Sequence, residues 1–406
     1  MASLVLVVAV ALTASMFMSW TVGANSNSAP VAPAVGANAL SVLRAALLVG
    51  VVAGLGAIVQ GGSISETIGK DLVTGVTITP VAAAAALLTA ATLITIGNTR
   101  GYPIPSAFAV TGAMVGAGIS LGGGFATDEY VRILAFWFTI PIANAIIAYS
   151  VARTLRSESV PESVGIPLLA GLVGYAVANI QLTVTPKPNG APGSIARALS
   201  TDWHLLPTHV FGSYTLGMVV ISVGFGLLAL LATRWALTGN EEKGINRFLV
   251  VLGLMVVFTS GGTQVGLATG PLESIFETDL HLSPVYLLAL GGLGILVGAW
   301  TRAPRLIQAV SQEYASLGPR RSIAALIPAF LIAQLAIVLG IPISFNKVMI
   351  SSIVGAGLAV RSSGSGGGVS ASKAGYTLGA WVFSMVGAGL ISFGLYRVLT
   401  MIPGFT

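Results

Sequence analysis

The stretch GANSNSAPVAPAVGANAL, from Gly23 to Leu40, decides the fold expected for this chain. It follows an apolar run, Ala2–Trp20, yet it carries three Asn, two Ser and two Pro before apolar character returns near Val42. Pro and Asn interrupt helices, because Pro lacks a backbone donor and Asn favours turns. The stretch is therefore either a surface loop between two helices or a break at bilayer depth. A break at that depth is tolerated only where the backbone is buried in protein or lines a cavity.

The composition indicates an integral membrane protein. Of 406 residues, 55% are hydrophobic and only 8% are charged, whereas a soluble domain is about 25% charged. The chain has 51 Gly, and small residues allow close helix packing in a bilayer. Cysteine is absent, which excludes disulfides, Cys metal sites and thiol nucleophiles.

The net charge of +6 does not indicate nucleic-acid binding, because Lys and Arg gather in the cytoplasmic loops of polytopic proteins. The three histidines, His204, His209 and His281, fall in expected loops, so no Ser/His/Asp triad can be assembled at bilayer depth. We therefore expect no enzyme and no cofactor. The expected surroundings are the lipid bilayer of the cell membrane, crossed several times.

Twelve apolar runs fill most of the chain. They are Ala2–Trp20, Leu43–Val59, Val81–Ile96, Ile104–Leu121, Ile133–Val151, Ile166–Leu182, Val210–Leu231, Phe248–Phe258, Val285–Trp300, Ile323–Leu339, Ile341–Leu358 and Leu378–Leu395. At about 20 residues per span, they predict an all-α polytopic membrane protein with about 11 to 12 membrane segments. The shorter runs are expected to be half-helices or hairpins.

One long polar insertion, Thr183–His209, bisects the sequence. It predicts a first membrane half over residues 1–182, an external linker over 183–209 and a second membrane half over 210–406. Basic residues alternate with acidic ones along the loops. The basic set is Arg44, Arg100, Arg153, Arg156, Arg234, Lys243, Arg247, Arg302, Arg305, Arg320 and Arg321, and the acidic set is Glu66, Asp71, Asp128, Glu129, Glu273, Glu277 and Asp279. By the positive-inside rule the first run enters from outside, whereas the run from Phe248 leaves from inside, so the halves are inverted.

Two pairs of segments indicate the repeat. Gly23–Leu40 has a counterpart in Gly261–Leu272, GGTQVGLATGPL. Later, Tyr102–Gly124 and Ile341–Val360 share a Pro-Ile-(Pro)-Ser start and a Val-Gly-Ala-Gly sequence. Inverted repeats with Pro- or Gly-broken segments at matching positions are typical of the midplane substrate site of secondary transporters.

These segments resemble the inorganic phosphate transporter (PiT) family, whose repeats each carry a GANDVANAIG-type signature and a later P-[VI]-S-T-T-H segment. The first signature keeps Gly23, Ala24, Asn25, Gly36, Ala39 and Leu40; Ile64–Val73 resembles the family's next segment; and the second signature keeps Gly261 and Gly270-Pro271-Leu272. The resemblance covers nearly the whole chain outside the insertion. It implies two inverted repeats and transport of phosphate coupled to Na⁺ or H⁺.

The departures from the family pattern fall within the motifs. The signature Asp is replaced by Ser26 and Gln264, and its second Asn by Ala29 and Leu267. The S-T-T-H segments read Pro105-Ser106-Ala107-Phe108 and Ser344-Phe345-Asn346-Lys347. Both carboxylates and both histidines are missing, although hard cations prefer oxygen ligands and proton relays need titratable groups. The coupling ion, Na⁺ or H⁺, therefore stays open.

Neutral donors remain at the matching positions. The candidate substrate-binding residues are Asn25, Ser26, Asn27, Ser28, Ser106, Thr263, Gln264, Ser344, Asn346 and Lys347. Lys347 stands in an apolar setting, where an ammonium costs several kcal/mol unless it is paired or hydrated. Under our hypothesis it supplies the positive charge that a bound cation supplies elsewhere in the family. The alternative is that Lys347 extends to a membrane face.

We therefore expect an anion permease that moves inorganic phosphate or a related oxyanion by alternating access. Two alternatives remain: a permease for sulfate or another oxyanion, and a non-transporting homologue that acts as a membrane scaffold or regulator. Gly- and Ala-rich faces such as Val354–Gly357 would permit a homodimer.

Overall fold

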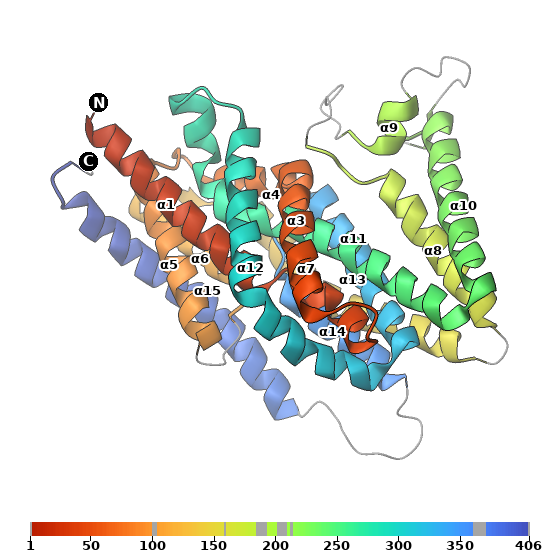
Figure 1. The fold of residues 1–406 in the computed structure, drawn as a ribbon. Helices are drawn as coiled ribbons and strands as arrows, with labels where there is room; N and C mark the ends of the chain where they lie inside the picture. The colour runs from red at the N-terminus through yellow and green to blue at the C-terminus, as the bar shows by residue number, and fades with distance from the viewer. Residues whose placement is uncertain are drawn as a thin grey trace.

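Helices make up nearly all of the regular structure (Figure 1). The computed structural model describes residues 2–99, 104–157, 160–183, 193–200, 209–211, 214–359 and 371–404. The longer helices are α1 Ala2–Asn25, α3 Val42–Gln60, α5 Pro80–Thr99, α6 Ser106–Ser120, α7 Thr127–Arg156, α8 Glu162–Ala178, α10 Leu216–Gly239, α11 Glu241–Thr269, α12 Pro284–Leu317, α13 Pro319–Leu339, α14 Phe345–Leu358 and α15 Ala371–Thr400. Within the described residues, nine helical stretches are long and apolar enough to cross a membrane, and α6, α8 and α14 are shorter apolar helices. The predicted all-α membrane class is confirmed.

Short elements connect these helices. They are the 3-10 helices η1 Ala29–Val31 and η4 Gly270–Leu272, the π-helices η2 Thr67–Asp71 and η5 Ile275–Asp279, the short α-helices α2 Ala32–Gly36, α4 Gly62–Glu66 and α9 Ile195–Ser200, and the strands β1 Val73–Thr74, β2 Gly124–Phe125, β3 His209–Phe211 and β4 Tyr214–Thr215. The strands form two antiparallel pairs, β1 with β2 and β3 with β4.

The predicted break after the first apolar run is confirmed. Helix α1 ends at Asn25, and the chain then turns through η1 and α2, with Pro30 and Pro33 in their first turns. Residues 26–34 of this break are buried. A surface loop is thus the wrong interpretation, because the non-helical backbone lies inside protein, as bilayer depth requires.

The second signature behaves differently from the first. Helix α11 runs without interruption through Gly261 and Gln264 to Thr269, and only then passes into η4 at Gly270-Pro271. The expectation of a matching break inside Gly261–Leu272 is therefore wrong for most of that stretch. The reason is that Pro, which stops the first copy at its eighth residue, comes in the second copy only at its eleventh.

Other boundaries also differ from the apolar runs. The run Phe248–Phe258 is the middle of the 29-residue α11, and Val285–Trp300 is the first half of the 34-residue α12. Polar residues at their ends hid these extensions, since a helix can continue into the headgroup region. The run Ile341–Leu358 begins helical structure only at Phe345, after Gly340 takes a left-handed conformation with φ of 65°.

Several helix contacts made by elements of the first half have an equivalent contact made by the corresponding elements of the second half. Helix α1 packs on α12 and α3 packs on α11; α5 packs on α6 and α13 on α14; α6 packs on α15 and α14 on α7. Helices α3 and α12 also pack on each other. This correspondence is what two similar halves around a pseudo-two-fold axis produce, and it supports the inverted-repeat prediction without measuring the inversion itself.

The polar insertion is only partly described. Its first residue, Thr183, accepts a hydrogen bond on Oγ1 from the Gly62 amide at 3.1 Å. The insertion also contains α9. Residues 184–192 and 201–208 lie outside the described residues. The division of the chain into two halves and a linker therefore stays a prediction.

Glycines set the closest helix crossings. An ideal Cβ at Gly116 of α6 would overlap the carbonyl of Gly389 on α15, whereas a Cβ at Gly387 of α15 would meet no atom within 4 Å. The two helices thus approach at a distance that only a missing side chain allows, as in other membrane bundles.

We predict opposite effects for two matched substitutions. Gly116→Ala should destabilise the detergent-solubilised protein by about 1–3 kcal/mol, because it overpacks the crossing. Gly387→Ala should be neutral or stabilise it by up to about 1 kcal/mol, since Ala is the better helix former. Thermal unfolding of both variants checks this, and equal shifts in the same direction would contradict the assigned crossing.

Candidate functional site

Helix α11 carries a stripe of buried polar side chains through the centre of the bundle. Thr259, Ser260, Thr263, Gln264 and Thr269 are each fully buried. Most of them are three or four residues apart, so they lie on neighbouring faces of the helix. Buried polar groups are costly unless they are hydrogen-bonded, and their partners identify the segments that meet here.

Gln264 joins three segments. The Ser106 hydroxyl, in the first turn of α6, donates to Gln264 Oε1 at 2.9 Å. Gln264 Nε2 donates to the carbonyl of Ile343 at 3.0 Å, just before α14 begins. The starts of the short apolar helices α6 and α14 therefore meet on Gln264, the residue that replaces the second signature Asp. A neutral amide can do this because it both accepts and donates.

The break in α1 lies against the same stripe. Asn27 and Ser28 have no exposed surface. Ser260 Oγ donates to Asn27 Oδ1, but the Asn27 amide nitrogen and the Ser28 hydroxyl have no partner among the described residues. A buried group left in this state costs about 1–3 kcal/mol. These two groups are thus available to a ligand.

Lys347 lies in the first turn of α14 and is only 8% exposed. Its Nζ lies 3.6 Å from the ring centroid of Trp381 and 4.3 Å from that of Phe108. Phe108 in turn stacks on Trp137 at 3.8 Å. The alternative that Lys347 extends to a membrane face is therefore wrong. Aromatic faces attract the ammonium and hold it inside the bundle.

The ammonium has no carboxylate partner in the described part of the chain. The ion pairs found there join Lys70 to Glu273 and Glu277, Arg132 to Glu129, and Arg320 to Glu162. The aromatic faces attract the ammonium but carry no net charge and do not replace the oxygen acceptors that its three N–H donors would have in water. Lys347 thus retains capacity for an anion.

The other predicted substrate-binding residues lie in different surroundings and have different hydrogen-bond partners. Asn25 is half-buried and donates to Asn98 Oδ1 on α5 at 3.2 Å, so its side chain is engaged outside the Gln264 junction. Thr263 Oγ1 donates to the Ser260 carbonyl of its own helix at 3.0 Å. Ser26 and Ser344 are buried, and Asn346 is half-buried.

Sequence reasoning missed a pair of glutamines beside the stripe. Gln60 Nε2 donates to Gln334 Oε1 at 3.2 Å, and Gln334 Nε2 donates to Thr259 Oγ1 at 2.8 Å. Gln60 Oε1 is buried without a partner. The available signal was Gln334 itself, the one amide within the apolar run Ile323–Leu339.

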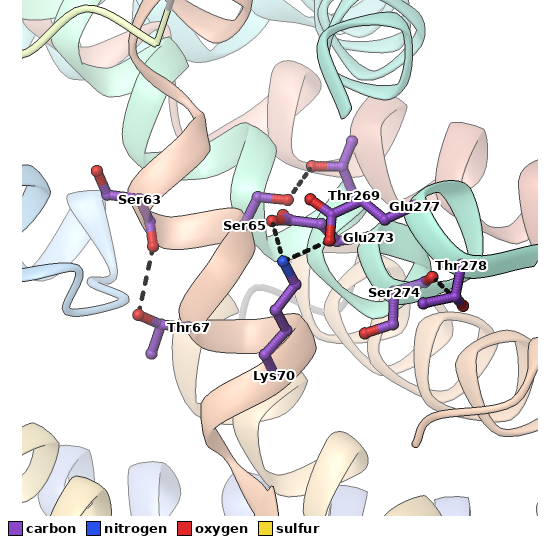
Figure 2. Close-up of polar contacts among 9 residues, drawn as sticks. All are labelled: Ser63, Ser65, Thr67, Lys70, Thr269, Glu273, Ser274, Glu277 and Thr278. Carbon is purple, nitrogen blue, oxygen red and sulfur yellow. Dashed lines mark hydrogen bonds and ion pairs between the residues drawn. The ribbon is translucent and has the colours of Figure 1, made fainter. Parts of the chain in front are cut away.

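A second polar cluster lies at the far end of α11 (Figure 2). Lys70 Nζ lies 2.7 Å from Glu277 Oε2 and 3.5 Å from Glu273 Oε1. The hydroxyls of Ser65 and Thr269 are 3.3 Å apart. Glu273 and Glu277 were expected together in one of the acidic loops, apart from the loop that holds Glu66 and Asp71. The contacts tie η2, which comes after the first membrane helices, to η4 and η5 of the second half.

The donor set favours an anion over a metal ion. No group of three or more His, Asp or Glu able to hold a metal occurs among the described residues. The side chains that hydrogen-bond at and beside the Gln264 junction are amides and hydroxyls, and Lys347 follows four residues after the Ile343 carbonyl that Gln264 binds. Such groups hydrogen-bond oxyanions, and Lys binds phosphate as a point charge.

Comparisons with known proteins agree with this geometry. A protein of Pyrococcus furiosus that is named as a phosphate permease is 26% identical over 95% of this chain and 95% of its own length. An inorganic phosphate transporter of Arabidopsis thaliana chloroplasts is 25% identical over 84% of this chain and 64% of its own length.

A solved structure of a sodium-dependent phosphate transporter matches the fold. Its TM-score is 0.80 and its sequence identity 21%, and the match covers 98% of this chain and 99% of that one. The family model described as the phosphate transporter family matches residues 22–392. The chain belongs to the phosphate transporter family.

Proposed function

We propose that this protein is a permease that carries inorganic phosphate across the membrane. Its family and the names of its relatives support this. The observation that carries the proposal is the pair of buried groups without partners in the α1 break, Asn27 Nδ2 and Ser28 Oγ. Broken helices at bilayer depth mark substrate sites in secondary transporters, and these two groups stabilise the folded state only when a ligand satisfies them.

The substrate-binding residues are assigned by the same argument. Asn27 and Ser28 are proposed to hydrogen-bond the oxyanion directly, with Ser106 and Gln264 closing the site from α6 and α11. Ser26, Ser344, Asn346 and Thr263 are proposed to line it, whereas the bond of Asn25 to Asn98 makes Asn25 a support of the break.

Lys347 is proposed to replace the coupling cation. Helix α14 presents its N-terminus and Lys347 together, and a helix N-terminus attracts anions through its free N–H groups and dipole. Phe108 of α6 and Trp381 of α15 fix the ammonium between them. Because the Lys347 ammonium belongs to the protein, the positive charge in the site does not have to come from a cation that moves down its gradient. Transport therefore need not require Na⁺.

Sulfate is the competing substrate. Hydrogen phosphate has one O–H to donate and needs an acceptor, and the signature carboxylates that would accept it are replaced by Ser26 and Gln264. Sulfate needs donors only, which suits the amides and the ammonium. A scaffold or regulatory role without transport is the remaining alternative.

Alternating access is proposed from the equivalent packing of the two halves, because rocking of one repeat against the other around a fixed midplane site is how such folds work. The Val354–Gly357 face is not available for a dimer, because Gly355 packs on the Ala145 carbonyl of α7. A homodimer in the membrane is proposed instead through the apolar outer helix faces.

The first prediction concerns uptake into proteoliposomes. We expect labelled phosphate uptake that persists without a Na⁺ gradient, because the positive charge is built in. Labelled sulfate is the parallel assay and an imposed pH gradient the second condition. Strictly Na⁺-driven uptake would contradict the role of Lys347, and uptake of neither anion would favour the scaffold alternative.

The second prediction concerns Lys347. Lys347→Met should weaken phosphate binding roughly 10- to 100-fold, since hydrogen bonds to charged groups contribute about 1.5–3 kcal/mol. Lys347→Arg keeps the charge and should retain most of the binding. Scintillation proximity or calorimetry measures both, with a monodisperse elution profile as the folding control. Equal affinity of the Met variant and the wild type would refute the assignment.

The third prediction concerns Asn27. Asn27→Leu removes an amide nitrogen that has no partner among the described residues, but it also removes the Oδ1 that accepts from Ser260. It should therefore lower thermal stability by no more than about 1 kcal/mol while lowering substrate affinity. Loss of stability without loss of affinity would mean that Asn27 is structural. The matched control is Asn98→Leu in the same assay, because Asn98 bonds Asn25 and lies outside the Gln264 junction.

A further inference from the structure

Two adjoining cavities run along α11 on the side away from the polar stripe. The larger, of about 540 Å³, is lined by Lys243, Asn246 and Arg247 near the start of α11, together with Ala39, Val250 and Val251. The smaller, of about 420 Å³, continues from Val251 and is lined only by apolar side chains, among them Val52, Leu254, Phe258 and Phe330. The two share Val251, so a basic opening leads into an apolar crevice.

The crevice exists because one helix pair stands away from the rest of the bundle. Helices α8 and α10 pack closely on each other, since Gly174 and Gly226 leave room for the partner backbone. Toward the core, α8 contacts α13 and α7 far less than it contacts α10, and α10 packs on α11 at Gly244, where a Cβ would overlap the Ala236 carbonyl. Figure 1 shows the pair at one side of the molecule.

The size and chemistry of the crevice exclude two occupants. An oxyanion would lose its hydration without gaining a hydrogen bond, because no polar side chain lines the apolar part. A helix of a second copy is too wide, because two turns of a helix about 10 Å across fill roughly 850 Å³. This is about twice the volume of the apolar crevice, which is about 420 Å³. A single hydrocarbon chain has the right width.

The length and charge complete the match. From Lys243 to Phe258 the helix rises about 22 Å at about 1.5 Å per residue, which spans most of the ~30 Å hydrocarbon core of a bilayer. Lys243 and Arg247 are four residues apart and lie on the same helix face, and both are exposed. Neither Glu241 nor Glu242, which precede them, lines the cavity.

We propose that this groove binds an anionic phospholipid, with one acyl chain in the apolar crevice between α11, α3, α13 and the end of α8, and the headgroup phosphate on Lys243 and Arg247. Basic pockets between membrane helices at the cytoplasmic side bind anionic headgroups in this manner. The site is separate from the proposed substrate site and does not depend on the proposed function.

The test uses the full-length protein in nanodiscs of phosphatidylcholine with a minor fraction of phosphatidylglycerol. Native mass spectrometry then measures which lipid stays bound. We expect enrichment of phosphatidylglycerol, which the double variant Lys243→Gln/Arg247→Gln should lower about 30-fold, from the loss of two basic contacts. Arg305→Gln, another exposed basic residue, is the matched control and should change nothing.

A second variant tests the crevice itself. Val251→Trp should lower retention of both lipids, because it fills the point where the two cavities meet, and more than half of the Val251 side chain is exposed, so folding tolerates the change. Equal retention of the two lipids by the wild type, an equal loss in Arg305→Gln, or full retention in Val251→Trp would overturn the proposal. Displacement of phosphatidylglycerol by inorganic phosphate, or retention only in dimers, would overturn it as well.

Discussion

The structure depends on one constraint: backbone that leaves the helical pattern at bilayer depth must be enclosed by protein. The break after Asn25 meets it through complete burial of Asn27, Ser28 and the adjoining proline turns. Enclosure requires neighbours that approach closely, which accounts for the glycines at crossings such as Gly56 of α3, where a Cβ would overlap the Phe258 carbonyl of α11. The same enclosure creates a dry volume in which a few polar groups can recognise an ion.

The two halves meet this constraint by different means. In the first half the helix itself breaks, and its polar side chains are left partly without partners. In the second half α11 stays intact, and Gln264 uses both ends of its amide to fix the starts of α6 and α14. The first half thus contributes donors without partners among the described residues, whereas the second half fixes the starts of α6 and α14.

Much of the fold could be predicted from the sequence, because apolar length and loop charge are local properties. The class, the break after Asn25 and the late start of helix near Ser106 all depend on Pro, Gly and hydropathy. The course of α11 could not be predicted, since its signature was matched to the broken copy although its single Pro, Pro271, comes only at the eleventh residue of the stretch. The aromatic surroundings of Lys347 come from α6 and α15, which are remote in sequence, so no pattern near Lys347 could distinguish an enclosed ammonium from one at the surface. The Gln60–Gln334 pair escaped notice for the same reason.

Enclosure of Lys347 by Phe108 and Trp381 also has an electrical consequence. In the proposed rocking around a fixed site, access switches from one side to the other, so the Lys347 charge shifts relative to the transmembrane field, in which each elementary charge is worth about 2.3 kcal/mol per 100 mV. With a protonated Lys347 the empty site would carry one positive charge, whereas the site loaded with a divalent oxyanion would carry one negative charge. The two directions of the cycle would therefore respond to membrane voltage with opposite sign, and the resting potential itself would set which of them is slow.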